Sequence, residues 1–327
     1  MGAGVTPARR RLYSPLPPCS TPARMNRLID RMPAGARGPA WMILSCFAFA
    51  TMWGLIRLAS RDLSPFVLVF YRNAFGLLAL TPMLLRNPGL MVTSRLPVHV
   101  RRATSGIIAT YCTFYAVSNA PMAVALAINY SAPLFATVGA VLFLGEKIHG
   151  RRIGAVLVGF AGVLVVLRPG SMPMTPGIAA AMISAVTTAF SLVAIKQLVG
   201  SDDSRSVTVW SFVLMLPVSA AVALFWWKWP APETWPLLVA IGICAAVGQL
   251  SMSRAFQLSE ATAVMPYDFV RFGLVTLIGI TMFDERLDAF TLIGGALVIG
   301  STIYLAYREA VVARSLRPAS QVADRAL

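Results

Sequence analysis

Two charged residues, Asp268 and Arg271, lie inside one of the most apolar stretches of the chain, residues 262–283. A charge at the centre of a membrane helix costs about 2.5–3.5 kcal/mol on insertion scales, so each charge needs a reason. Residues three apart share a helix face, so this pair can partly neutralise itself. One interpretation is a binding site, in which Arg271 holds a carboxylate or phosphate and Asp268 holds an amine or a coupling proton. The other is a structural ion pair between helices.

Hydroxyl, amide and aromatic side chains in other apolar stretches provide further candidates. Tyr111 and Tyr115 are four residues apart and share a helix face. Such groups would orient a polar ligand and stack on a planar one, or would simply join neighbouring helices by hydrogen bonds. Together with Asp268 and Arg271, the candidate binding residues are Tyr267, Asn129, Tyr130, Tyr111, Tyr115, Gln249 and Trp53.

A second set of charges lies nearer the predicted helix ends and is typical of gating or structural roles. Arg72 would either extend to the membrane surface or pair across the bundle with Asp268. Contacts of Arg254 or Lys196 with Glu260 would close one end of the bundle, with Arg57 as the counterpart of Lys196 at the other end. The alternative is ordinary charge at the membrane interface.

The composition indicates that these residues belong to a membrane protein with many spans. The 327 residues are 57% hydrophobic and 13% charged, with a mean hydropathy of +0.71. Because a soluble globule needs more charge to cover its surface, this balance excludes a soluble enzyme, a disordered chain and a disulfide scaffold. The four cysteines show no metal-binding spacing, so we expect no metal, cofactor or catalytic residue.

Apolar stretches of about 20 residues, long enough to cross a bilayer, predict the transmembrane helices. The chain contains ten, at residues 40–58, 65–86, 102–119, 122–144, 152–168, 175–196, 207–227, 235–257, 262–283 and 288–307. An even number places both termini on one side of the membrane.

The basic residues predict which side that is. With a cytoplasmic N-terminus, 21 Lys and Arg fall in cytoplasmic segments and five on the opposite side. This asymmetry supports cytoplasmic termini and accounts for the net charge of +15, so nucleic acid is not expected as a partner. The only histidines, His99 and His149, fall in predicted loops. An intramembrane enzyme is therefore disfavoured, because it usually needs a base or metal ligand within the bundle.

The two halves of the chain resemble each other at a shift of 139 residues. Asn129-Tyr130 then aligns with Asp268-Phe269, and Glu146 aligns with Glu285. Because each half holds five predicted spans, the second half must enter the membrane from the opposite side, an arrangement typical of carriers. We predict an N-terminal tail (1–39), two repeats (40–169 and 175–307) and a C-terminal tail (308–327), both tails being cytoplasmic and the first disordered.

The chain also resembles a known family through several short motifs. These are Phe70-Tyr71-Arg72-Asn73-Ala74, Ala132-Pro133-Leu134, Gly145-Glu146-Lys147, Ser259-Glu260-Ala261-Thr262-Ala263, Pro266-Tyr267-Asp268-Phe269 and Asp284-Glu285-Arg286. Together they resemble the drug/metabolite transporter superfamily, in its ten-helix EamA type. The resemblance implies an all-α integral membrane protein with a 5+5 inverted repeat. It also implies a substrate cavity between the third, fourth, eighth and ninth spans.

The expected function is a secondary transporter for a small polar metabolite in a bacterial inner membrane. Proton coupling through Asp268 is one mechanism, and uniport or exchange is equally allowed. The resemblance leaves amino-acid-like compounds, riboflavin and S-adenosylmethionine as cargoes, with drug efflux or a lipid-linked amine flippase as alternatives. The expected partners are the substrate and the lipid bilayer. Glycine-rich faces in the fifth and tenth spans would also allow a homodimer.

Overall fold

The computed structural model describes residues 33–132, 134–135, 150–168, 174–199, 201–259, 264, 267–286 and 288–315. Within these residues the chain is helical and shows no strand. The α-helices are α2 (Ala34–Ala59), α3 (Pro65–Arg86), α4 (Leu96–Asn119), α5 (Met122–Asn129), α7 (Gly150–Leu167), α8 (Pro176–Val199), α9 (Ser204–Phe225), α10 (Trp235–Leu258), α12 (Val270–Phe283) and α13 (Ala289–Ser315). Short 3₁₀ turns, η1 (Pro88–Met91) and η2 (Pro232–Thr234), precede α4 and α10.

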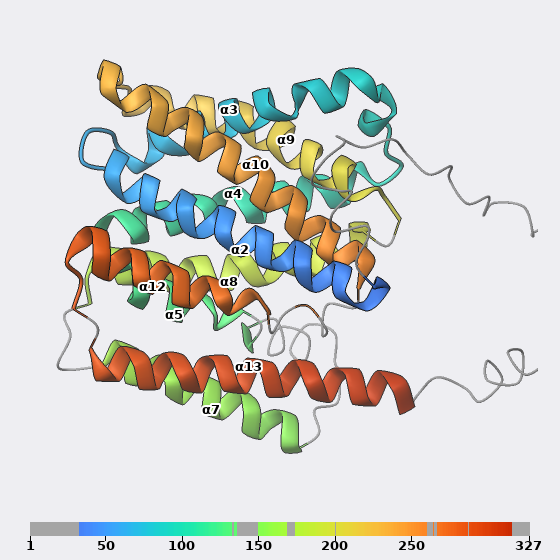
Figure 1. Ribbon diagram of the computed structural model, residues 1–327, viewed down its shortest axis with the longest axis vertical. Coiled ribbons are helices and arrows are strands. Elements are labelled where there is room, and N and C mark those ends of the chain that lie inside the picture. Colours follow the sequence, from blue (N-terminus) through green and yellow to red (C-terminus); the bar gives the residue numbers. More distant parts are fainter. Residues whose placement is uncertain are drawn as a thin grey trace, which may run out of the picture.

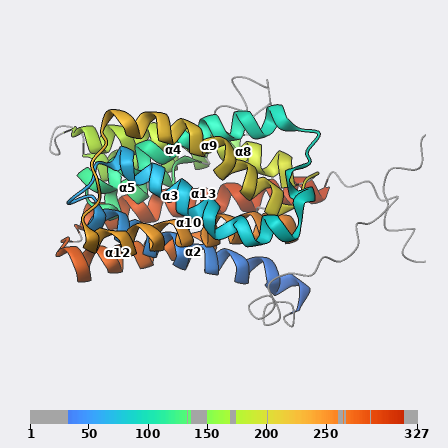
Figure 2. The same cartoon turned by 90° about the horizontal axis from the view of Figure 1, so that it is seen from above.

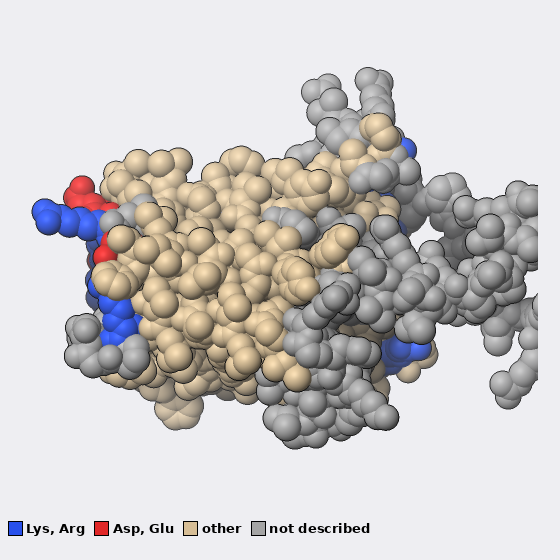
Figure 3. All heavy atoms as spheres, turned by 90° about the horizontal axis from the view of Figure 1, so that it is seen from below, with Lys and Arg blue, Asp and Glu red and all other residues tan. Residues whose placement is uncertain are grey.

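The helices lie roughly alongside one another as an elongated bundle (Figures 1 and 2). In the described part of the chain, five helical stretches are long and apolar enough to cross a bilayer: Ala36–Ala59, Pro65–Arg86, Pro176–Val199, Ser204–Phe225 and Pro232–Leu258. Three shorter apolar helices are Ile153–Leu167, Val270–Phe283 and Ala289–Tyr304. Figure 3 shows charged side chains at the two ends of one face, with an uncharged band between them. This band is the surface that a multi-pass protein presents to lipid.

Local sequence signals fix several helix starts. Ser64 accepts a hydrogen bond from the Phe66 amide and Pro65 occupies the first turn of α3. Asp203 accepts a 2.8 Å hydrogen bond from the Arg205 amide at the start of α9. Both are N-caps, which satisfy amide groups that have no partner within the helix.

Packing between the helices follows the internal repeat. The α2 helix packs along α10, and α4 packs along α8. A shift of 139 residues relates α2 to α8 and α4 to α10, so these two packings are equivalent. The α3–α9 and α7–α13 contacts each join a helix to its own counterpart. In Figure 1, α7 and α13 lie together along one edge of the bundle.

Close backbone approach explains the glycines of that edge. A side chain on Gly162 would lie 2.8 Å from the carbonyl oxygen of Gly294, and one on Gly294 would lie 2.6 Å from that of Gly162. These two positions therefore require glycine for the contact between α7 and α13 within one chain.

Most helix boundaries agree with the apolar stretches, but α5 ends at Asn129 and α12 begins only at Val270, so the predicted spans 122–144 and 262–283 are not continuous helices. The α3 helix spans 65–86 as predicted, whereas α4 starts at Leu96, six residues before the predicted start. The prediction that His99 lies in a loop is therefore wrong, since His99 is a buried residue of α4. The α2 and α13 helices also extend into the ranges predicted as tails. His149, the rest of both tails and most of 130–149 lie outside the described residues.

Candidate functional site

A cavity of about 160 Å³ lies in the interior of the bundle, between the two halves of the chain. Helices α2, α3, α4, α5, α8, α9, α10 and α12 all contribute to its wall, including the four that correspond to the predicted third, fourth, eighth and ninth spans. The lining residues are Phe49, Met52, Trp53, Arg72, Arg102, Gly106, Ala109, Thr110, Thr113, Phe114, Asn129, Thr188, Ser191, Leu192, Ile195, Met215, Gln249, Met252 and Arg271.

A second, smaller cavity of about 60 Å³ adjoins the first. Asn129 and Arg271 line both cavities, and Tyr130 and Asp268 line the smaller one. Asn129 is held in place because its amide donates a 2.8 Å hydrogen bond to the Ser184 hydroxyl of α8.

Asp268 and Arg271 form an ion pair between the two cavities, as their three-residue spacing predicted. The Arg271 Nη2 atom lies 2.5 Å from the Asp268 Oδ2 atom. The aromatic rings of Phe49 and Tyr130 lie 5.4 and 5.8 Å from the guanidinium carbon, which adds cation–π attraction. The Tyr130 hydroxyl donates a 2.7 Å hydrogen bond to the Asp268 carbonyl oxygen. The pair is thus fixed to α5 and α2 at the edge of the cavity.

Arg72 and Arg102 are two further cations in the wall of the larger cavity. Arg72 neither extends to the surface nor pairs with Asp268, so both sequence interpretations of its side chain are wrong. It is 6% exposed, donates to the Asn73 side chain at 2.7 Å and lies over the Phe212 ring. Arg102, the first residue of the predicted third span, is 2% exposed and lies on α4.

Arg102 is a buried cavity-lining residue that the sequence motifs do not single out. With α4 starting at residue 96, Arg102 shares a helix face with Gly106, Ala109 and Thr113, all of which line the cavity. The spacing of Gly106, Ala109 and Thr113 after Arg102 indicates one helix face of small and hydroxyl residues that includes this arginine. The apolar count did not show this face because it started the predicted helix at Arg102.

Of the other predicted binding residues, two line the larger cavity and three do not. Gln249 and Trp53 line the larger cavity. The Tyr111 and Tyr115 rings instead contact the Phe66 ring, at 5.7 and 6.5 Å between centroids. Tyr267 is 40% exposed and belongs to neither cavity as the structure describes them. Pro266, its neighbour in the predicted motif, lies outside the described residues.

At one end of the bundle, several segments are joined by a cluster that we call the latch: Arg57, Glu285, the carbonyl groups of Val117 and Ala120, and the amide of Met122. Arg57 donates to the two carbonyl oxygens at 2.5 and 3.0 Å and lies 3.8 Å from Glu285. The Glu285 carboxylate accepts the Met122 amide at the start of α5. The latch therefore joins α2 and the α12–α13 connection to the α4–α5 turn.

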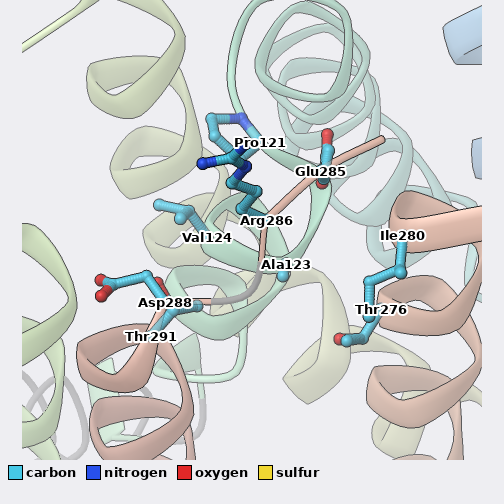
Figure 4. Close-up of a pocket in the computed structure, with 9 residues that line it drawn as sticks. All are labelled: Pro121, Ala123, Val124, Thr276, Ile280, Glu285, Arg286, Asp288 and Thr291. Carbon is cyan, nitrogen blue, oxygen red and sulfur yellow. The ribbon is translucent and has the colours of Figure 1, made fainter. Parts of the chain in front are cut away.

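The backbone after α12 aims Glu285 into the latch. Asp284 has a left-handed conformation (φ 51°), and the Glu285 amide bonds back to the Gly279 carbonyl group. A side chain at Gly279 would lie 2.8 Å from the Glu285 carboxylate, so glycine makes room for it. A small pocket of about 20 Å³ beside the latch contains Glu285, Arg286 and Asp288 from this connection (Figure 4).

The predicted gating residues Arg254, Lys196 and Glu260 belong to the opposite end of the bundle. Arg254 donates to the Gln257 side chain of the same helix at 3.3 Å. Glu260 and Glu146 lie outside the described residues, as does the side chain of Lys196. The predicted contacts of Glu260 with Arg254 or Lys196 thus stay predictions.

Comparison with known proteins shows which protein family this chain resembles. A model of the EamA-like transporter family matches this chain twice, at residues 36–168 and 175–307. A solved structure aligns with a TM-score of 0.62 at 20% sequence identity, covering 86% of this chain and 99% of the other chain. This likeness concerns the fold alone.

Three relatives illustrate what similar chains do. The pseudopaline exporter of Pseudomonas aeruginosa is 31% identical over 268 residues, covering 80% of this chain and 93% of the relative. The S-adenosylmethionine uptake transporter of Rickettsia felis is 26% identical over 281 residues, covering 86% and 96%. The riboflavin transporter of Rhizobium johnstonii is 27% identical over 289 residues, covering 86% and 94%.

Proposed function

This chain belongs to the EamA-like transporter family and is a multi-pass membrane transporter for small metabolites; we propose that it moves its cargo through the larger cavity by alternating access. The observation that carries this proposal is the position of the cavity. It lies where the two matched halves meet, and residues from both halves form its wall.

The proposed topology has ten spans, arranged as two inverted five-helix repeats with both termini in the cytoplasm. The equivalent α2–α10 and α4–α8 packings support the repeat, and the distribution of basic residues supports the orientation. In this orientation the latch lies at the outer end of the bundle. The membrane is the bacterial inner membrane, and the two family matches, at residues 36–168 and 175–307, support the division into two repeats.

Alternating access follows from the repeat. In inverted-repeat carriers, exchanging the conformations of the two halves opens the opposite side of the same site. Glu285 of the outer latch corresponds to Glu146, and Arg57 corresponds to Lys196. We therefore propose that Lys196 helps to close the inner end when the outer latch opens, through the contact with Glu260 that the sequence predicts.

The cavity residues have distinct roles in this mechanism. Asn129, Gln249 and Trp53 contact the cargo, and the pair Asp268–Arg271 marks the passage between the two cavities. Because Asp268 is already paired with Arg271, a coupling proton would have to displace that contact. Tyr111, Tyr115 and Tyr267 are kept as candidates that would reach cargo in another state of the cycle.

Uptake by reconstituted vesicles tests the function. Purified protein in proteoliposomes would be offered S-adenosylmethionine, riboflavin, pseudopaline and amino acids, with and without a pH gradient. Saturable accumulation that exceeds protein-free vesicles supports the carrier, and a response to the gradient that is lost in Asp268→Asn supports coupling. Hydrolysis or modification of a compound without its net movement would contradict the proposal.

Access to the cavity tests the mechanism. A cysteine at Thr110, in a background without other cysteines, would be labelled by a membrane-impermeant thiol reagent from one side at a time. Alternating access predicts that cargo changes the ratio of labelling from the two sides. Equal labelling from both sides at once would indicate a channel.

A further inference from the structure

Arg72 and Arg102 give the larger cavity a positive charge that no described residue of its wall balances. The described linings of the two cavities together carry three guanidinium groups, of Arg72, Arg102 and Arg271, against one carboxylate, of Asp268. That carboxylate is bound to Arg271. The excess charge therefore belongs to Arg72 and Arg102.

From this excess we infer that the cargo is an organic anion, and that its carboxylate or phosphate group binds Arg72 and Arg102. The inference rests on the proposed function, because it assigns a substrate class to the same cavity. It differs from a site centred on Asp268 and Arg271, in which the protein already neutralises itself.

Arg102 carries the strongest part of the argument. Its side chain is fully enclosed, yet its Nε and Nη2 atoms have no hydrogen-bond partner, and its Nη1 atom has only a 3.4 Å bond to the Val207 carbonyl oxygen. A buried charged donor without a partner is expensive, and a guanidinium has a planar fork that fits a carboxylate or phosphate. Both donors are enclosed in this state of the protein, and together they form the side of the fork that a carboxylate or phosphate would bind once the side chain turns toward the cavity.

Arg72 is the second part of the same site. Its Nη1 atom is held by Asn73, whose own amide donates to the Ser219 hydroxyl of α9 at 3.1 Å. These bonds fix the guanidinium while its buried Nε atom stays without a partner. Arg72 and Arg102 line the same cavity. Two mutually repelling cations in one cavity wall favour an anion between them over a neutral ligand.

The relatives' named cargoes differ in how well they match this charge. S-adenosylmethionine carries a sulfonium and an ammonium against one carboxylate, and riboflavin is uncharged. Neither would balance Arg72 and Arg102. We therefore expect both to bind less well than a compound with two or more anionic groups.

Thermal stability of the purified full-length chain tests the inference without knowledge of the cargo. A bacterial small-molecule extract would be divided by ion exchange into anionic, neutral and cationic fractions, and each would be added to the protein. Glutarate and its neutral diamide, glutaramide, would be compared directly, beside inorganic phosphate. We expect the anionic fraction, and glutarate over glutaramide, to raise the Tm by several degrees.

Variants test whether the rise in Tm caused by anions depends on Arg72 and Arg102. The double variant Arg72→Gln/Arg102→Gln should lose the stabilisation, whereas Arg101→Gln should keep it, because Arg101 is an exposed arginine on the same helix. The charge-retaining Arg72→Lys/Arg102→Lys should keep part of it, since lysine lacks the planar fork. An unliganded Tm of Arg102→Gln at or above that of the wild type would show that the arginine is held for binding, because a structural role predicts a fall.

Several results would overturn the inference. These are stabilisation by the neutral or cationic fraction instead of the anionic one, no stabilisation by any fraction, or an anion effect that survives in the double glutamine variant. If inorganic phosphate raised the Tm as much as any organic anion, the site would bind small ions and would not select an organic cargo. Failure of the carrier itself would look different: anions would bind in an arginine-dependent way but would not enter proteoliposomes.

Discussion

The two halves of the chain contribute matching positions to the cavity wall but different chemistry. Shifting by 139 residues relates Phe49 to Thr188, Trp53 to Leu192 and Thr110 to Gln249, and all six residues line the larger cavity. The arginines break this correspondence. The counterparts of Arg72 and Arg102 are Ser211 and Ile241, and neither carries charge.

The symmetric wall positions and the asymmetric arginines serve two different purposes, the change of conformation and the recognition of cargo. Two mirror-related states require backbones and packing that are equivalent in both halves, and the wall positions satisfy this requirement. Recognition of a cargo requires no symmetry, because the cargo itself has none. Charge can therefore be concentrated on a few positions while the framework stays balanced.

The largest expected effect comes from breaking the ion pair Asp268–Arg271, the one balanced charge pair among the described residues of the two cavity walls. Arg271→Gln would leave Asp268 partly buried without its partner and should lower the free energy of unfolding by about 3 kcal/mol. The double variant Asp268→Asn/Arg271→Gln should recover most of this loss. Chemical denaturation in detergent measures both. Equal losses in the single and double variants would contradict the pairing.

A smaller effect is expected from opening the outer latch. Glu285→Gln weakens a charge-assisted contact with the Met122 amide and with Arg57, so the outward-open state should gain about tenfold in population, equivalent to 1.4 kcal/mol. Labelling of a cysteine at Thr110 from the outer side would rise accordingly. The exposed Glu233→Gln is the control. Unchanged labelling in Glu285→Gln would show that the latch does not control access.

Two loops at opposite ends of the bundle offer a matched comparison of stability. Asp202 of the α8–α9 loop is bound by His99 at 2.9 Å and by Thr93 at 2.8 Å, whereas Asp62 of the α2–α3 loop has a 3.4 Å contact with Thr234. Burial opposes ionisation of Asp202, but hydrogen bonds from His99, Thr93 and Ser201 outweigh it and lower its pKa below the usual range.

A carboxyl group with a lowered pKa stabilises the folded state above its unfolded pKa, and this stabilisation is lost as the pH falls through the folded value. Asp202→Asn should therefore cost about 1 kcal/mol at pH 7, and the difference from wild type should shrink below about pH 4. Asp62→Asn should cost less. Melting curves between pH 3 and pH 7 test both. A wild-type advantage that grows towards low pH would contradict the sign of the pKa shift.

The smallest expected effect concerns a hydroxyl of the first half whose counterpart is apolar. Thr113 lies 2.6 Å from the Ser184 hydroxyl, which also holds Asn129, while the corresponding residue of the second half is Met252. Thr113→Val should weaken ligand binding about threefold, since hydrogen bonds between membrane helices contribute about 0.6 kcal/mol. Titration of glutarate against both proteins checks this. A hundredfold loss would mean that Thr113 contacts the ligand directly.

The prediction of an all-helical, multi-pass membrane protein is confirmed, for a physical reason. Apolar length predicts membrane-crossing segments, and the three-residue spacing of Asp268 and Arg271 predicts the ion pair, which forms across the start of α12. Both are local properties of the chain. The family resemblance from the motifs is confirmed by the two family matches.

Contacts between distant segments could not be predicted in the same way. Nothing near Arg72 in the sequence indicates that its guanidinium would lie over Phe212, because Phe212 comes from the other half of the chain. Arg102 was missed since counting loop charges treats an arginine at a helix end as exposed. Tyr111 and Tyr115 share a helix face as expected, but only the fold shows that Phe66 covers that face.

The most direct test of the account is a structure with a ligand bound. Cryo-electron microscopy of the full chain, with an antibody fragment to add mass, would be performed with the most strongly stabilising compound of the anionic fraction. The account predicts ligand density in the larger cavity, with an anionic group within hydrogen-bond distance of Arg72 and Arg102. Density at another place, or a ligand bound only to Asp268 and Arg271, would contradict it.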